Sequence, residues 1–325
     1  MLLMQFLGGR LAKGAIVLMA IAVLNFFLIR AAPGDPAQVL AGEAGASDAI
    51  LLAQLRARFG LDEPLLHQLW IYLKGYLTLD LGYSYRQQAS VATLVWDRLP
   101  ATLLLTGTAF AVSLALGVLL GGLAARRAGR WSDSAITVLA LVFYATPLFW
   151  VALMSQIVFA LKLGWVPNVG FETIGARHTG FARAMDIGHH LILPSLTLGL
   201  FFTAIYARMM RASMLEMAGA DFVKTAKAKG LGETAITWRH IARNAILPVV
   251  TLAGLQAGQL VGGAVLTETV FAWPGIGRLM FDALLQRDYA VILGVFFVSS
   301  ALVILFNIAT DLVYRLADPR IQATS

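Results

Sequence analysis

Four stretches of this chain carry no charged side chain and are long enough to cross a membrane as helices. They are Leu99–Ala125, Ser134–Leu161, Ala245–Thr267 and Tyr289–Thr310. A helix needs roughly 20 apolar residues to cross the ~30 Å hydrocarbon layer of a bilayer. Two more apolar stretches are Leu11–Ile29, interrupted only by Lys13 near its start, and Leu191–Ala207. The sequence therefore predicts an all-α polytopic membrane protein with about six transmembrane helices.

The composition agrees with a membrane environment and excludes several kinds of chemistry. Hydrophobic residues make up 59% of the 325 residues and charged residues only 13%, whereas soluble domains average about a quarter charged. The chain has no cysteine. Disulfides, thiolate metal sites and cysteine nucleophiles are therefore excluded.

The distribution of positive charge predicts the orientation in the membrane. The net charge is +7. If the N-terminus is cytoplasmic, the short inner segments hold fourteen Lys and Arg residues and the short outer loops hold five. Lys and Arg collect in cytoplasmic loops, and long translocated segments are largely exempt from this rule. We therefore expect both termini in the cytoplasm. We attribute the net positive charge of the chain to its membrane topology rather than to a nucleic-acid partner.

Two segments outside the membrane are long. The first, Ala31–Pro100, is expected to be external, with helix-like amphipathic stretches at Asp48–Phe59 and Leu65–Leu77 and turns at Pro33-Gly34 and Gly60-Leu61. The expected division is an N-terminal transmembrane helix (1–30), a periplasmic segment (31–97) and a core membrane domain (98–320) with an inner loop at 212–244. A Gly-rich external loop, Lys162–His190, is expected between the third and fourth spans.

The inner segment Met209–Asn244 contains the pattern of a short helix. Asp221 is a candidate N-cap and Gly230 a candidate C-terminal stop, with Lys224, Lys227 and Lys229 between them. Phe222 and Val223 could supply apolar contacts. A second helix is expected from Glu233 through Arg239 into the fifth span.

A helix of two turns is marginal in water unless it docks on something. One interpretation is that this helix docks into a partner protein. The other is a solvated basic loop at the membrane surface, touching anionic lipid.

The stretch Asp221–Pro248 resembles the cytoplasmic "EAA" loop of ABC importer permeases. The loop's glycine corresponds to Gly230 and its small residue to Ala226. Lys224 stands where the general pattern has Glu, and Arg243 where it often has Pro. The run Lys-Thr-Ala-Lys-Ala-Lys-Gly-Leu, from position 224, followed by Arg239-His240, is instead similar to the dipeptide, oligopeptide and nickel branch of the family.

Further motifs extend the resemblance over nearly the whole chain. They are Arg30-Ala-Ala-Pro-Gly-Asp-Pro-Ala37, Phe59-Gly-Leu-Asp-Glu-Pro64, Leu79-Asp-Leu-Gly-Tyr-Ser84, Arg98-Leu-Pro-Ala-Thr102, Glu268-Thr-Val-Phe-Ala-Trp-Pro-Gly-Ile-Gly-Arg278 and Leu316-Ala-Asp-Pro-Arg320. Together they resemble the B-type permease subunit of a dipeptide/oligopeptide ABC importer, with a type I permease fold.

The resemblance implies partners and site residues. Such systems pair two similar permeases with two ATPase subunits and a periplasmic solute-binding protein in the bacterial inner membrane. The inner helix would be the coupling helix that sits in a groove on the ATPase. The residues this implies for coupling are Asp221, Phe222, Lys224, Ala226, Lys227, Gly230 and Arg239.

The chain itself has no G-x-x-x-x-G-K-[S/T] phosphate-binding loop, which uses backbone amides and a lysine to hold nucleotide phosphates. ATP hydrolysis is therefore expected on a partner chain, and we expect neither an enzymatic activity nor a cofactor here. Relatives handle dipeptides, oligopeptides, glutathione-like molecules, opines or nickel chelates, and peptide is expected from its frequency in the family.

Small and polar residues in the fifth span are candidates for packing and for the translocation path. Gly254, Gly258 and Gly262 recur at four-residue spacing, which places them on one face where helices can approach closely. The close helix contact on this face could lie within the chain or between two subunits. Gln256, Gln259 and Glu268 are the candidates for the path, although Glu268 could instead cap a turn or pair with Arg278. Pro147 and Pro194 are each expected to kink a helix, as a static bend or as a hinge.

Two other function classes are less consistent with the sequence. An ion-coupled secondary transporter or channel would use the polar residues of the fifth span, but the two halves carry no inverted repeat. An intramembrane enzyme would use His189-His190. Adjacent helical residues point about 100° apart, which is poor geometry for sharing a metal, and the sequence suggested no supporting carboxylate nearby.

Overall fold

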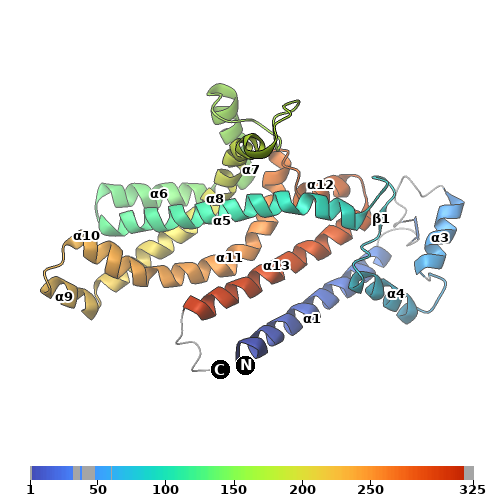
Figure 1. Cartoon of the computed structure of the whole chain (residues 1–325), viewed down its shortest axis with the longest axis horizontal. Helices are drawn as coiled ribbons and strands as arrows, with labels where there is room; N and C mark the ends of the chain where they lie inside the picture. The colour runs from blue at the N-terminus through green and yellow to red at the C-terminus, as the bar shows by residue number, and fades with distance from the viewer. Residues whose placement is uncertain (1, 32–36, 39–47, 60, 318–325) are drawn as a thin grey trace. The chain divides into compact units, whose positions relative to one another are not determined.

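The computed structural model of the chain describes residues 2–31, 37–38, 48–59 and 61–317, and in these ranges it is almost entirely helical (Figure 1). Its elements are α1 (Leu2–Ala31), α3 (Ala49–Phe59), α4 (Leu65–Leu77), β1 (Tyr83–Ser84), β2 (Ala89–Ser90), α5 (Val91–Arg126), α6 (Trp131–Ala145), α7 (Leu148–Ser155), the π-helical η1 (Gln156–Lys162), α8 (Gly180–Ala218), α9 (Asp221–Ala228), α10 (Glu233–Ala235), the π-helical η2 (Ile236–Ile241), α11 (Ala242–Val270), α12 (Ile276–Leu285) and α13 (Tyr289–Ala317).

The expectation of about six spans is confirmed, with two of them bent. Within the described residues, four continuous helices are long and apolar enough to cross a membrane, and they lie in α1, α5, α8 and α13. Two bent pairs complete the set. Residues 131–145 and 148–162 meet at 105°, and residues 233–260 and 262–270 meet at 56°.

The two prolines that were expected to kink helices behave differently. At Pro147 the helix ends and a new one starts, because a residue before proline is driven to extended backbone and Thr146 has ψ 133°. The expected kink in Ser134–Leu161 is therefore a full break between α6 and α7. Pro194 lies inside the unbroken α8. The prediction that the outer loop runs to His190 was wrong, since α8 already begins at Gly180.

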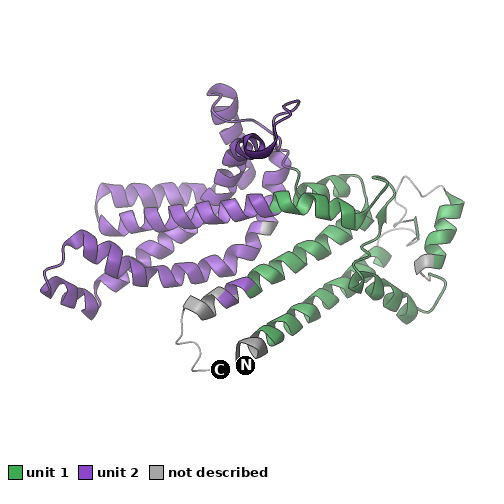
Figure 2. Ribbon diagram, viewed as in Figure 1, with its two compact units in different colours: residues 1–102, 274–308 green, residues 103–273, 309–325 purple. Residues whose placement is uncertain are grey.

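The contacts group the chain into two units (Figure 2). Unit 1 comprises residues 1–102 and 274–308, and unit 2 comprises 103–273 and 309–325. This grouping reflects packing within the chain, whereas the division expected from the sequence (1–30, 31–97 and 98–320) follows the order of the membrane segments. That expected division stays a prediction. The motifs at 30–37 and 316–320 lie partly outside the described residues, as do the expected turns at Pro33-Gly34 and Gly60.

Unit 1 joins the long segment after α1 to the start of α5, α12 and most of α13. Its core contains Tyr76, Val91, Val95, Leu279 and Val291. The expected helices of the external segment are confirmed as α3 and α4, and the Asp48 carboxylate accepts the backbone N–H groups of Ile50 and Leu51 at the start of α3.

Residues of separate motifs meet inside unit 1. The Ser84 hydroxyl donates to the buried Asp288 carboxylate at 2.5 Å, and Asp288 also accepts the Val291 N–H at the start of α13. The Ile276 N–H donates to the Thr102 hydroxyl at 2.9 Å. These buried polar contacts connect the start of α13 to the antiparallel pair β1–β2 and the start of α12 to the first part of α5.

Unit 2 is built around α8, which packs on α6, α7 and α11. The part of α5 that belongs to this unit approaches α8 very closely. A Cβ at Gly117 would lie 2.5 Å from Tyr206 Cβ, and one at Gly121 would collide with the Ala207 carbonyl oxygen. Glycine is required at these two positions because the backbones nearly touch.

Candidate functional site

The segment between α8 and α11 has the predicted form of two short helices. α9 spans Asp221–Ala228, and α10 and η2 lead without a break into α11. The prediction that Asp221 is the N-cap was wrong. Ala220 is the N-cap, with extended backbone and no side-chain cap bond, and Asp221 is the first helical residue. There its carboxylate faces the positive end of the helix dipole and binds Lys224 Nζ at 2.8 Å.

The C-terminal end of α9 depends on Gly230, as predicted. Gly230 has φ +75°, a conformation that costs other residues free energy because of the Cβ atom. Its N–H donates to the Lys227 carbonyl at 2.9 Å, and the Leu231 N–H donates to the Ala226 carbonyl at 3.3 Å. This pair of bonds is a Schellman motif, which ends the helix after two turns and turns the chain toward η2.

The side chains of α9 separate into an inward and an outward face. Val223 and Ala226 are buried, with 3% and 5% of their surface exposed, and α9 packs against η2. Lys224 and Lys227 are exposed, and Phe222 keeps 36% of its surface exposed. The helix is therefore held by its apolar face and presents lysines and one aromatic ring outward, and Arg239 on η2 is exposed as well.

An ion pair that the sequence analysis missed fixes the neighbouring helix ends. The buried Asp133 carboxylate of α6 accepts two bonds from the Arg211 guanidinium of α8, at 2.6 and 2.7 Å, and a third from the Gly129 N–H at 3.0 Å. The only signal in the sequence was a single Asp between a basic loop and an apolar span. This bidentate geometry is the strong form of a carboxylate–arginine contact.

Two further contacts connect η2 and α10 to α5. Arg126 donates to the Thr234 hydroxyl at 3.0 Å. The Trp238 ring lies so close to Gly122 that an added Cβ would be 2.8 Å away. These contacts join α10 and η2 to the end of α5, and η2 is continuous with α11.

Comparisons with known proteins identify the family. Residues 117–323 match the model of the family described as "binding-protein-dependent transport system inner membrane component". Residues 3–106 match a second model, which describes the N-terminal part of such membrane components. The chain belongs to this family. The segment between α8 and α11 lies within the first of these matches.

Two relatives support this membership, and a solved structure shares the fold. The dipeptide transport system permease protein DppB of Alkalihalophilus pseudofirmus is 40% identical over 322 residues, covering 94% of this chain and 96% of the relative. The di/tripeptide transport system permease protein DppB of Pseudomonas aeruginosa is 37% identical over 336 residues, covering 98% and 99%. An inward-facing structure of the MetNI methionine ABC transporter aligns with TM-score 0.55 at 18% identity, over 69% of this chain and 96% of that one.

Family membership confirms three predictions. The chain is an ABC importer permease of the dipeptide/oligopeptide branch. It has the helical fold of a type I importer permease. It is a multi-pass component of the inner membrane.

In this permease the candidate path residues lie in different surroundings. Gln256 is half-buried, and its Oε1 atom accepts no hydrogen bond from the described residues. Gln259 is exposed, and Glu268 is completely buried. Of the three, Gln259 is the one whose side chain is open to a solute or to a partner subunit.

The three glycines of α11 that were predicted to pack on one face also differ. Gly254 and Gly258 are buried, whereas Gly262 is exposed with no atom within 4 Å of an added Cβ. An added Cβ at Gly254 would collide with Thr310 Cγ2 on α13, and the Thr310 hydroxyl donates to the Gly254 carbonyl at 3.2 Å. The close approach at Gly254 is therefore internal to the chain. The 56° bend between residues 260 and 262 explains why Gly262 leaves the common face.

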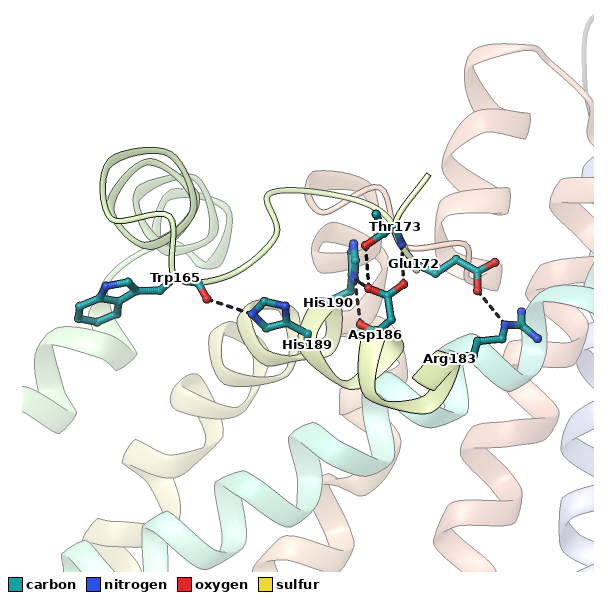
Figure 3. A network of polar contacts seen from close by, with 7 residues as sticks. All are labelled: Trp165, Glu172, Thr173, Arg183, Asp186, His189 and His190. Carbon is teal, nitrogen blue, oxygen red and sulfur yellow. Dashed lines mark hydrogen bonds and ion pairs between the residues drawn. The ribbon is translucent and has the colours of Figure 1, made fainter. Parts of the chain in front are cut away.

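The histidine pair belongs to a network that fastens the loop before α8 (Figure 3). Asp186 accepts the N–H and the hydroxyl of Thr173, both at 2.7 Å, and lies 3.5 Å from His190 Nδ1. His189 Nε2 contacts the Trp165 carbonyl oxygen at 3.0 Å. The expectation that no carboxylate supports the histidines was wrong. The helix α8 begins at Gly180, earlier than the sequence predicted, and Asp186 lies on it one turn before His190.

Both histidine rings have hydrogen-bond partners in this network. The part of the chain that the structure describes contains no group of three or more His, Cys, Asp or Glu side chains suited to a metal ion. Gln156 adds to the same loop anchor by donating to the carbonyls of Asn168 and Val270, at 3.0 and 3.1 Å.

A small cavity of about 100 Å³ in unit 1 lies beside Tyr72 and Tyr76 of α4. The Tyr72 hydroxyl donates to the Tyr76 hydroxyl at 2.9 Å. Burial raises the pKa of both phenols, so both stay neutral. The cavity is therefore lined mainly by aromatic and apolar side chains, with Asp80 as its one ionisable carboxylate among the described lining residues.

Proposed function

We propose that this permease, together with a second homologous permease, forms the path by which an ATP-driven importer moves peptides across the inner membrane. A periplasmic solute-binding protein delivers the peptide, and two nucleotide-binding subunits hydrolyse ATP. The names of the two relatives, dipeptide and di/tripeptide permeases, support peptides over nickel chelates, glutathione or opines. This chain is the non-catalytic subunit, and it has no phosphate-binding loop of its own.

The observation that carries the proposal is α9. It is held by Val223 and Ala226 and presents Phe222, Lys224 and Lys227 outward. A basic helix with one exposed aromatic ring fits an acidic groove with an apolar pocket, since aromatic side chains dominate the binding energy of interfaces. Asp221, Gly230 and Arg239 would shape and flank this contact.

Capture of the cognate ATPase subunit in detergent tests the contact. We expect Phe222→Ala to weaken capture at least tenfold, because hot-spot aromatics contribute about 2 kcal/mol or more. Phe181→Ala is the matched control, since Phe181 is also exposed and belongs to the same unit but lies at the start of α8. Equal capture by wild type and Phe222→Ala would contradict the role of α9.

Peptide uptake into proteoliposomes tests the wider function. Uptake is expected only when this chain, its homologous partner, the ATPase subunits, the peptide-loaded binding protein and ATP are all present. Uptake by this chain alone, driven by an ion gradient, would instead establish the secondary-transporter alternative.

Orientation is testable because the chain has no cysteine. The exposed residues Thr225 and Ile174 can each be replaced by a single cysteine. A membrane-impermeant thiol reagent should label Ile174→Cys in intact spheroplasts and Thr225→Cys only in inside-out vesicles. The reverse pattern would place α9 outside, away from any ATPase.

A further inference from the structure

A basic groove of about 590 Å³ lies in unit 2 beside the coupling helix. Its charged lining comes from the end of α5 and the turn after it, from α9 and from α10. These residues are Arg126, Arg127, Arg130, Lys227 and Glu233. Four positive charges and one negative charge around one hollow favour an anion.

The basic side chains are not neutralised within the chain. Arg126 donates to the neutral Thr234 hydroxyl. Among the described residues, none of the ion pairs involves Arg126, Arg127, Arg130 or Lys227. All four are exposed, and guanidinium groups match the oxygens of a phosphate with paired hydrogen bonds.

The surroundings of the groove indicate which phosphate compound it fits. Apolar side chains such as Met214, Ile236 and Ile241 also line it, and none of the described residues lining it is aromatic, so a nucleotide base would find no ring to stack on. Directly after Arg130, Trp131 exposes 85% of its surface at the start of an apolar span. Exposed tryptophan marks the membrane interface, the depth at which phospholipid headgroups lie.

We propose that this groove binds the phosphodiester headgroup of an anionic phospholipid from the inner leaflet. Basic pockets between transmembrane helices on the cytoplasmic side are suited to such headgroups. Lys227 of α9 and the arginines after α5 face the same groove, so one bound phosphate joins the coupling helix to the end of a transmembrane helix. Binding does not depend on the proposed function, whereas an effect of lipid on coupling does.

Native mass spectrometry of the purified chain, with phosphatidylglycerol or phosphatidylcholine added, tests the binding. We expect phosphatidylglycerol to bind at least tenfold more tightly than phosphatidylcholine, since each basic residue near an anionic surface adds about 1 kcal/mol. The variant Arg126→Gln/Arg127→Gln/Arg130→Gln should lose this preference. Inorganic phosphate in a parallel titration should displace little lipid, because it lacks the acyl chains.

A charge-matched control is Lys224→Gln/Lys229→Gln/Arg243→Gln. It removes the same charge from the same predicted inner surface, but these residues do not line the groove, so the lipid preference should remain. If the arginine variant misfolds, Lys227→Gln alone should weaken phosphatidylglycerol binding severalfold.

Three results would overturn the proposal. One is equal phosphatidylglycerol binding by wild type and both groove variants. Another is an equal loss in the control variant. The third is complete displacement of the lipid by inorganic phosphate. If the groove variants keep lipid and lose only capture of the ATPase subunit, the groove is a protein contact and the lipid proposal is wrong.

Discussion

Replacing Gly230 with alanine should uncouple ATP hydrolysis from transport while leaving the membrane helices folded. Gly230 has φ +75°, and no atom lies within 4 Å of an added Cβ, so the cost of the change comes from the backbone alone. A left-handed conformation costs a non-glycine residue roughly 1–2 kcal/mol. This disfavours the observed helix end by a factor of about 5–30.

The consequence is large for α9 because the helix is short. It has eight residues, and two backbone bonds to the carbonyls of Ala226 and Lys227 form its C-terminal end. Losing that geometry changes the direction in which the chain enters η2 and the angle at which Phe222 and Lys224 face a partner. We expect transport-coupled ATP hydrolysis in proteoliposomes to fall several-fold.

Two variants make the prediction specific. Gly219→Ala is the matched control, because Gly219 has φ −83° and its nearest neighbour to an added Cβ is the Glu216 carbonyl at 3.6 Å. It should couple normally. Gly230→Asn should recover part of the activity lost in Gly230→Ala, since asparagine tolerates the left-handed region.

The reasoning would be refuted by wild-type coupling in Gly230→Ala at equal complex assembly. It would also fail if asparagine were no better than alanine at this position. Either result would mean that the left-handed turn is not what positions α9.

Three other changes have outcomes set by the structure. Asp133→Ala should lower the free energy of unfolding by about 2–3 kcal/mol in a denaturation assay. This is somewhat less than for a fully buried pair, because a third of the Arg211 side chain is exposed. Asp133→Glu should lower the free energy of unfolding by a smaller amount. Gly254→Ala should destabilise the protein by about 1–3 kcal/mol through overpacking. Adding Thr310→Ser to this variant should restore stability, because it removes the colliding methyl group and keeps the hydroxyl bond. A double variant as unstable as Gly254→Ala would contradict the assigned collision. Asp186→Asn should speed proteolysis of the loop before α8, because the carboxylate accepts two bonds from Thr173, and an unchanged cleavage rate would show that this anchor is dispensable.

The membrane class, the family and the local form of the segment between α8 and α11 could be predicted from the amino-acid sequence alone. Span length follows from bilayer thickness, so the charge-free runs predict the transmembrane helices without any knowledge of their packing. Gly230 ends α9 through its own backbone preference, and that too is a local property. The motifs at 79–84, 98–102 and 268–278 indicated the family although their contacts were unknown.

Contacts between residues far apart in the sequence could not be predicted and are known only from the folded chain. Asp133 pairs with Arg211, and Gly254 with Thr310, across long sequence separations, and no spacing rule connects such positions. Asp221 lost its expected role as N-cap because Ala220, the residue before it, takes the extended conformation at the helix start. The 105° angle at Pro147 and the 56° bend before Gly262 also depend on packing, since a sequence shows where a helix can bend but not by how much. Hydrophobic pattern and backbone preference act over a few residues, whereas burial and ion pairing depend on helices that are brought together only when the chain folds.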